Sequence, residues 1–216
     1  MNRHKLVIID YGLCNLRSVY NALKKIGFDS FVSDNPQGLK TADAVILPGV
    51  GAFEDGMKGL RDKKLIEPIK DFVKTGKPFL GICLGMQMLM SKSFEFGEHQ
   101  GLNLIEGQVE GFKNKIINGQ YDFKIPHIGW NGLFSNGHPW SKTILEDLPQ
   151  GQEMYFVHSY HVMPSDQANV LAQTQYAGIK FCSVVGKDNI YGCQFHPEKS
   201  SSFGLKILNN FVRLIQ

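Results

Sequence analysis

No stretch of this sequence is long and apolar enough to cross a membrane, and its first residues lack the core of a secretory signal. The first apolar run, residues 6–9, is short and ends at Asp10. The sequence also contains no Cys-x-x-Cys pair among its four cysteines, which are Cys14, Cys83, Cys182 and Cys193. Without a secretory signal, this spacing predicts reduced thiols in a cytoplasmic protein.

Neither sign of charge dominates the chain. The formal net charge is +3 over 216 residues, with 23 basic and 20 acidic side chains. Proteins that bind nucleic acid or membrane surfaces through bulk charge carry a larger excess, so neither kind of partner is expected. The sequence has no internal repeat, low-complexity segment or linker. With 43% hydrophobic residues, residues 1–216 are expected to form one domain.

Motifs for cofactors and metals are missing or incomplete. Gly49 and Gly51 follow an apolar run, as in a dinucleotide-binding loop, but Glu54 occupies the position of the third glycine. No phosphate-binding P-loop occurs. Cys193 and His196 have a Cys-x-x-His spacing without a second ligand pair. We therefore expect neither a cofactor nor a metal site.

The first half of the chain alternates apolar runs with helical patterns. Residues 6–9 and 44–47 are fully apolar runs, which are typical of strands buried on both faces. Apolar residues spaced three and four apart predict a helix from residue 16, and residues 60–75 are predicted to form another. This alternation predicts an α/β fold with a mostly parallel central sheet and helices on both faces. Ligands of such sheets bind beyond the carboxyl ends of the strands.

The second half is richer in β-like segments. Short strands are expected in five ranges, which are 101–120, 123–134, 154–162, 181–185 and 190–195. An apolar stripe predicts a closing helix over residues 203–215. We therefore expect an additional, smaller β-rich portion in this half.

Residues 77–87 hold the most informative motif. An apolar run ends in Gly81-Ile-Cys83-Leu-Gly85, and a helix-forming segment follows at once. This is the pattern of a nucleophile elbow, where a tight strand-to-helix turn exposes the central side chain and glycines remove clashing Cβ atoms. The helix N-terminus favours a thiolate at Cys83. The alternative interpretation is that Cys83 is only a buried small hydrophobic residue.

A cysteine nucleophile needs a base and a group that orients it, and His196 is the best candidate for the base. It ends an apolar run, as Cys83 does, and Glu198 follows a stiffening proline. Three other histidines are expected at the surface, namely His4, His99 and His138. The remaining three lie in β-like segments and are expected to be packed or hydrogen-bonded, namely His127, His158 and His161.

Attack by Cys83 also requires two N–H donors for the developing oxyanion. One is expected to be the amide of Leu84, directly after the nucleophile. The other is expected from the glycine-rich loop 48–51 at the neighbouring strand end, from the amide of Val50 or Gly51 after a peptide rotation.

Three separated motifs now stand in one order, at residues 48–51, 81–87 and 194–198. With them the chain resembles the class I (triad-type) glutamine amidotransferases, which implies their flavodoxin-like fold. Five further segments are similar to the glutaminase subunits of imidazole glycerol phosphate synthase in histidine biosynthesis, at residues 10–12, 15–18, 93–97, 126–131 and 155–158. Cys14 stands where that family often has glycine.

The resemblance implies a role for each catalytic residue. Cys83 attacks the side-chain amide of L-glutamine, His196 moves the proton to the leaving ammonia, and Glu198 orients His196. The resulting thioester is hydrolysed to glutamate. Gln87 and Glu95 are expected to hold the amino-acid end of the substrate, and the backbone around His158, Ser159 and Tyr160 is expected to meet its carboxylate.

The resemblance also implies a partner. A separate (βα)8-barrel cyclase chain would form a heterodimer with this one, accept the ammonia through an internal tunnel, and make imidazole glycerol phosphate and AICAR. Three residues are expected to face that chain, namely Trp130, Tyr155 and Lys199. Little glutaminase activity is expected without it.

Three rival interpretations remain open. Close relatives of this subunit pair supply ammonia for amidated sugars of surface polysaccharides, and acceptor choice belongs to the partner. A non-enzymatic relative would use Cys83 only for packing, which the complete Cys–His–Glu set disfavours. Cys–His peptidases share the dyad, but Gln87, Glu95 and the motif at residues 126–131 favour glutamine.

Overall fold

A computed structural model describes residues 4–112, 116–117, 120–121 and 123–215. The elements of the first half are, in chain order, β1 Leu6–Ile9, α1 Leu16–Lys25, β2 Ser30–Ser33, α2 Pro36–Lys40, β3 Ala44–Gly49, α3 Phe53–Asp62, α4 Ile66–Lys74, β4 Phe79–Cys83 and α5 Leu84–Met88. The next elements are β5 Lys92–Ser93, β6 His99–Gln100, β7 Gly107–Gly111, β8 Ile116–Ile117, β9 Gln120–Tyr121 and β10 His127–Ser135. The last elements are β11 Gln152–His158, β12 Tyr160–Pro164, η1 Gln167–Asn169, β13 Val170–Tyr176, β14 Ile179–Lys187, β15 Ile190–Cys193, η2 Pro197–Lys199 and α6 Ser201–Arg213.

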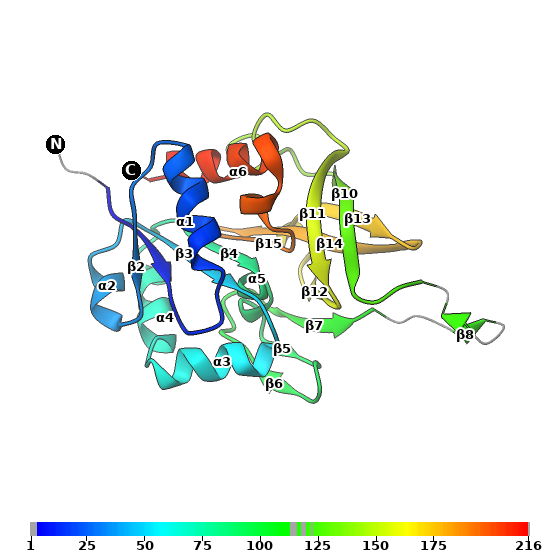
Figure 1. The fold of residues 1–216 in the computed structure, drawn as a ribbon, viewed down its shortest axis with the longest axis horizontal. Coiled ribbons are helices and arrows are strands. Elements are labelled where there is room, and N and C mark those ends of the chain that lie inside the picture. The colour runs from blue at the N-terminus through cyan, green and yellow to red at the C-terminus, as the bar shows by residue number, and fades with distance from the viewer. Residues whose placement is uncertain (1–3, 113–115, 118–119, 122, 216) are drawn as a thin grey trace.

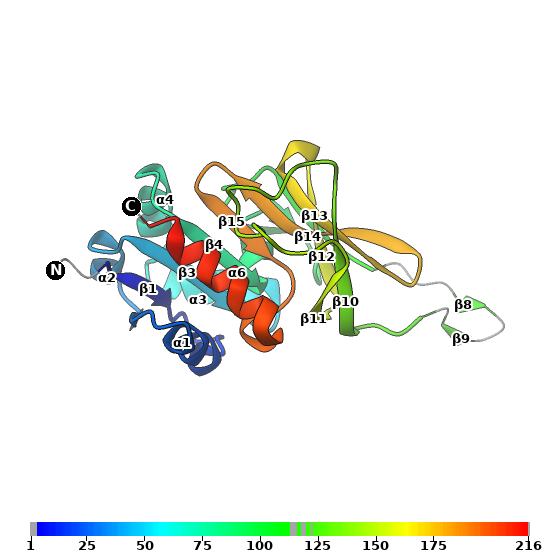
Figure 2. The ribbon, with the colours of Figure 1, turned by 90° about the horizontal axis from the view of Figure 1, so that it is seen from above.

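A nine-stranded sheet forms the centre, in the order β11-β10-β13-β14-β15-β4-β3-β1-β2. The five strands from β15 to β2 pair in parallel, and the strands from β11 to β15 pair antiparallel. The α/β fold is confirmed, but the expected mostly parallel sheet is only half parallel, since the β-rich second half extends the same sheet. Figures 1 and 2 show the antiparallel strands extending away from the helices.

Alternate residues of the parallel strands are buried in two separate hydrophobic cores, one on each face of the sheet. Leu6 and Ile8 of β1 pack with apolar residues of α1 and α6. Val7 and Ile9 of the same strand pack with apolar residues of α2, α3, α4 and α5. Because successive side chains of a strand point to opposite faces, helices cover both faces of this part of the sheet. Figure 1 shows α6 (red) above the sheet and α3 (cyan) below it.

Two smaller sheets complete the fold. One has the order β12-β7-β5-β6, and the other pairs β8 with β9. Parts of the β-like segment expected at 101–120, namely 113–115 and 118–119, lie outside the described residues. In the part of the chain that the structure describes, no helix has the length and apolar character needed to span a bilayer.

Two predicted elements differ from the structure. The single helix expected over residues 60–75 is wrong, since α3 ends at Asp62 and α4 starts at Ile66, with Lys64 between them at φ 55°. The single strand expected over residues 154–162 is interrupted at Ser159, where the chain passes from β11 in the central sheet to β12 in the smaller one. That corner carries part of the candidate site.

Candidate active site

Cys83 stands at a strained turn between β4 and α5. It is the last residue of the strand, and its backbone has φ 55° and ψ −108°. That conformation is unfavourable for any residue with a Cβ, so the surrounding structure must impose it. The side chain is 6% exposed and lies at the floor of a pocket. This is the nucleophile elbow that the motif predicts.

The two flanking glycines are required by close backbone approach. A Cβ on Gly81 would lie 2.7 Å from backbone atoms of Gly85, and a Cβ on Gly85 would overlap the carbonyl oxygen of Leu47. Both contacts arise because α5 turns back over β3 and β4 immediately after Cys83. Any larger residue would push α5 away and move the sulfur.

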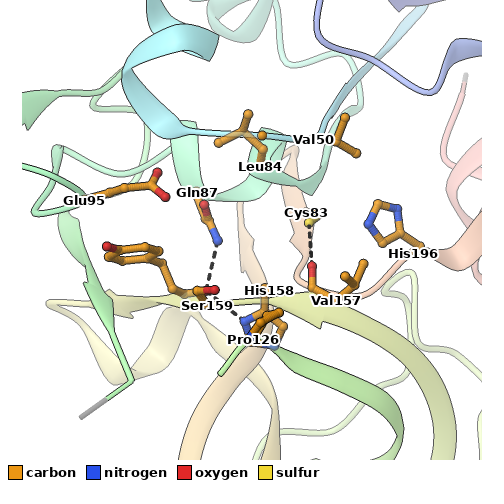
Figure 3. Close-up of a pocket in the computed structure, with 12 residues that line it drawn as sticks. Val50, Cys83, Leu84, Gln87, Glu95, Pro126, Val157, His158, Ser159 and His196 are labelled. Carbon is orange, nitrogen blue, oxygen red and sulfur yellow. Dashed lines mark hydrogen bonds between the residues drawn. The ribbon is translucent and has the colours of Figure 1, made fainter. Parts of the chain in front are cut away.

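His196 and Glu198 form a buried pair next to Cys83. The Nδ1 atom of His196 donates to Oε1 of Glu198 over 2.7 Å, and the two side chains are 2% and 1% exposed. His196 lies three residues after the end of β15, which pairs in parallel with β4, so His196 and Cys83 lie at the same edge of the sheet. Figure 3 shows the imidazole beside Cys83. The Nε2 atom makes no hydrogen bond to a described residue.

The protonation of His196 follows from these neighbours. Burial on its own lowers the pKa of His196, but the sulfur of Cys83 and the carboxylate of Glu198 outweigh it, and the net pKa is raised. A raised pKa keeps a proton on the ring until a basic leaving group can take it. The pair thus has the arrangement of a base and its orienting carboxylate.

Ser200 fixes this pair to the neighbouring strand. Its hydroxyl donates to the carbonyl of His196 over 2.6 Å and accepts the amide of Tyr155 over 3.0 Å. The amide of His196 in turn donates to the carbonyl of Tyr155 over 3.0 Å. His196 is therefore held by hydrogen bonds to β11 as well as by its connection to β15.

The pocket above Cys83 has a volume of about 290 Å³. It brings together residues from the three separated motifs at residues 48–51, 81–87 and 194–198. Its lining is Val50, Gly51, Cys83, Leu84, Gln87, Glu95, Pro126, Val157, His158, Ser159, Tyr160 and His196. Of the twelve, nine were named as catalytic, oxyanion or substrate-binding residues from the sequence, and the backbone around His158 was named with Ser159 and Tyr160. Pro126 and Val157 were given no role of their own.

Gln87 and Gln194 form a buried polar bridge along the pocket wall. The side-chain amide of Gln87 donates to the carbonyl of Tyr160 over 3.0 Å and to Oε1 of Gln194 over 3.2 Å. Gln194 is fully buried, and its own amide faces the sulfur of Cys83 at 3.8 Å. Sequence reasoning gave Gln194 no role. The signal was a polar residue inside an otherwise apolar strand segment.

Glu95 lies at the far end of the pocket from His196 (Figure 3). Its Oε2 atom accepts the amide of Phe53 at the start of α3 over 2.5 Å, and the residue is 9% exposed. Burial raises the pKa of Glu95, and the hydrogen bond from Phe53 opposes that rise. A carboxylate at this place can bind an ammonium group.

The residues expected to provide oxyanion donors, Val50, Gly51 and Leu84, line the same pocket as Cys83. Leu84 is the first residue of α5, where helix amides have no partner inside the helix. In the loop at residues 48–51, the amide of Val50 donates to the carbonyl of Leu13 over 3.1 Å. That bond directs the amide away from the pocket, so the predicted peptide rotation is needed before this amide can serve.

The three residues expected at a partner interface lie close to one another. Trp130 and Tyr155 stand opposite each other in the pair β10–β11, with ring centroids 5.9 Å apart. Trp130 is 47% exposed, and Lys199 is exposed in η2. The interface itself remains a prediction.

A Cys–His–Glu set at the carboxyl edge of an α/β sheet, beside one small pocket, is the arrangement of a triad-type glutamine amidotransferase. The family model "Glutamine amidotransferase class-I" matches residues 7–215, and the chain belongs to this family. Within it, the chain is 50% identical over 209 residues to imidazole glycerol phosphate synthase subunit HisH 1 of Legionella pneumophila (strain Lens), covering 96% of this chain and 98% of that protein. It is 46% identical over 207 residues to subunit HisH of Geobacter sulfurreducens, covering 96% and 97%.

Solved structures agree on the fold. PurLQS from Thermotoga maritima superposes with a TM-score of 0.72 at 20% identity, covering 99% of this chain and 100% of that chain. A crystal structure of a glutamine amidotransferase gives a TM-score of 0.72 at 18% identity, covering 97% and 98%.

Proposed function

We propose that this chain is the glutaminase subunit of an imidazole glycerol phosphate synthase, which hydrolyses L-glutamine and supplies the ammonia for histidine biosynthesis. The observation that carries the proposal is the pocket lined by Cys83, His196, Gln87 and Glu95, with Glu198 hydrogen-bonded to His196. The relatives named above are subunits of this synthase, and this chain matches nearly their whole length, which supports the same assignment.

The chemistry begins with attack of the Cys83 sulfur on the side-chain amide carbon of glutamine. The amides of Leu84 and of the loop at residues 48–51 would stabilise the oxyanion. The C–N bond then breaks, His196 gives its proton to the nitrogen, and ammonia leaves a thioester on the sulfur. Water, losing a proton to His196, attacks the thioester and releases glutamate and the thiolate.

Glutamine fits the pocket with its two ends at opposite sides. Glu95 would bind the α-ammonium group, and the backbone at Ser159 and Tyr160 its carboxylate. This placement directs the amide toward Cys83. Gln87 would contribute by fixing the Tyr160 carbonyl, which its side chain already contacts.

The acceptor of the ammonia would be a separate (βα)8-barrel cyclase, bound through the surface around Trp130, Tyr155 and Lys199. The loop at residues 48–51 rests with its Val50 amide turned to Leu13, which supports the expectation of little activity before the partner binds. We place this heterodimer in the cytoplasm, and we regard the whole chain as one glutaminase domain.

A glutaminase assay with and without the purified cyclase and its ribonucleotide ligand tests the proposal. Glutamate release should rise sharply when both are added. Rescue of a histidine auxotroph by the pair of genes separates histidine biosynthesis from the amidation of surface sugars, which uses the same chemistry in this subunit. A pair that releases glutamate but gives no rescue contradicts the pathway while leaving the glutaminase chemistry intact.

A further inference from the structure

Two buried histidines lie outside the catalytic set: His158 lines the pocket, and His127 is not among the lining residues. His127 of β10 is fully buried, His158 of β11 is 6% exposed, and the two stand opposite each other in the antiparallel pair. The ring of His127 is stacked between those of Phe156 and Tyr176, at centroid distances of 5.1 and 4.0 Å. Polar rings so deeply buried are stable only when their nitrogens have partners. All four nitrogens of this pair have one.

The direction of these hydrogen bonds can be worked out from one end. His158 Nδ1 lies 2.8 Å from the carbonyl of Tyr160, which can only accept, so Nδ1 carries the proton. Burial lowers the pKa of His158 to about 3, so its ring is neutral and Nε2 has no proton. Nε2 must then accept from Nδ1 of His127, at 3.1 Å. The bond from His127 to His158 and the bond from His158 to the Tyr160 carbonyl therefore donate in the same direction.

Tyr160 also lines the pocket. Its carbonyl accepts the bond from His158 and a second bond from the side chain of Gln87, over 3.0 Å, and the dashed lines from both residues are drawn in Figure 3. Gln87 then contacts Gln194, whose amide faces Cys83. The carbonyl is thus the point where the histidine pair meets the polar bridge that leads to the nucleophile.

The bond from His158 spans a structural corner. β11 ends at His158 in the central sheet and β12 starts at Tyr160 in the smaller sheet, so Ser159 belongs to neither strand. A bond from a side chain to the carbonyl two residues ahead closes this corner locally. The backbone held in this way is the segment expected to bind the carboxylate of glutamine.

The other end of the pair reaches β10 and β13. His127 Nε2 lies 2.7 Å from Oδ1 of Asn131. Because Nδ1 of His127 already donates to His158, this contact is a hydrogen bond only when both nitrogens of His127 carry protons. The amide of Asn131 donates to the carbonyl of Gln175 over 3.2 Å. Asn131 follows Trp130, whose half-exposed side chain belongs to the proposed partner surface. The chain of contacts therefore runs from the strand of that surface to the pocket.

We infer, on the basis of the glutaminase function proposed above, that His158 and His127 are positioning residues for glutamine binding. His158 holds the Tyr160 carbonyl and the corner at Ser159 in the geometry that receives the amino-acid end of the substrate, and His127 holds His158. Neither residue touches the reacting amide. Their loss should therefore weaken substrate binding more than it slows the chemical steps.

Two substitutions of His158 separate the lost hydrogen bond from lost packing. His158→Phe keeps a buried ring without the donor. His158→Asn keeps a donor, because the side-chain nitrogen of asparagine lies as many bonds from Cβ as Nδ1 of histidine does. His138→Phe is the matched control, since His138 lies far from the pocket lining and is half-buried. All are assayed as full chains in complex with the cyclase, after thermal melts confirm folding.

The expected change is in the KM for glutamine. His158→Phe should raise it about tenfold, the factor that one lost hydrogen bond typically gives, with kcat changed by less than about threefold. His158→Asn should restore most of the KM, His127→Phe should give a smaller rise than His158→Phe, and His138→Phe should change nothing. A purely structural role would instead reduce kcat through loss of active enzyme and leave KM unchanged.

An unchanged KM in a folded His158→Phe variant overturns the inference, as does a His158→Asn variant that is equally impaired. If His158→Phe does not fold, nitrogen-15 NMR of the unsubstituted protein decides. At neutral pH His158 should carry its proton on Nδ1 and none on Nε2, and the opposite tautomer overturns the inference. A wild-type complex without glutaminase activity would count against the proposed function instead, because the NMR result is read without turnover.

Discussion

Replacement of Cys83 should show that the elbow stores backbone strain. With φ 55° and ψ −108°, Cys83 occupies a conformation that costs a residue with a Cβ on the order of 1–3 kcal/mol. Glycine adopts it without that cost but loses more chain entropy on folding, by roughly 0.5–1 kcal/mol. Cys83→Gly should therefore be more stable than Cys83→Ala by about 1 kcal/mol, which is the reverse of the usual order.

Thermal unfolding measures this difference. For a chain of this size, about 1 kcal/mol corresponds to a Tm difference of about 2–4 °C. Cys193 is the matched control, because it is fully buried at the end of β15, the neighbouring strand, and is not among the residues with positive φ. There glycine should be the less stable of the two replacements, by roughly 0.5–1 kcal/mol. If glycine is equally unfavourable at both positions, the elbow holds no strain and the reasoning fails.

Three further predictions concern the same region. Gly85→Ala should destabilise the protein by several kcal/mol (roughly 3 or more), since the new Cβ would overlap the carbonyl oxygen of Leu47, and chemical denaturation measures the loss. Glu198→Gln should lower the pKa of His196 and reduce kcat by a factor on the order of 10² to 10⁴. The pH–rate profile should shift accordingly, and an unchanged profile would contradict the pairing of Glu198 with His196. Burial lowers the pKa of His158, so this residue stays neutral in the folded protein while it is protonated in the unfolded chain below a pH of about 6.5. The free energy of unfolding should therefore be unaffected by His158 above that pH and should fall by about 2 kcal/mol at a pH of about 5. Urea melts of His158→Gln should show a smaller loss of stability in acid.

The parallel part of the fold was predictable because its strands are buried on both faces. The runs at residues 6–9 and 44–47 contain only apolar residues, and no other element gives so plain a pattern. The junction of the parallel and antiparallel halves was not predictable, since β15 pairs with its hairpin neighbour β14 on one side but with the distant strand β4 on the other. Lys64, in the break between α3 and α4, adopts a left-handed conformation that no glycine announces. Pro68 in the first turn of α4 was the available signal, since a proline inside a continuous helix over residues 60–75 would disrupt it.

Within the site, residues marked by a local motif were found, and residues whose role depends on distant contacts were not. Cys83 and His196 each end an apolar run, so local sequence indicates their exposure at one edge. Gln194 lies 111 positions from Cys83, and no local pattern shows that the two meet. His127 and His158 were expected to be packed or hydrogen-bonded, which is confirmed, but only the structure shows that their bonds lead to the pocket.

The central claim is that the Cys83 sulfur attacks glutamine and carries the acyl group. Acid quenching of the complex with its cyclase during turnover, followed by mass spectrometry of the peptides, tests it most directly. The peptide that contains Cys83 should gain the mass of glutamine minus ammonia, and the gain should disappear in Cys83→Ala. Glutamate formation with no adduct, or with the adduct on Cys14, Cys182 or Cys193, would contradict the account.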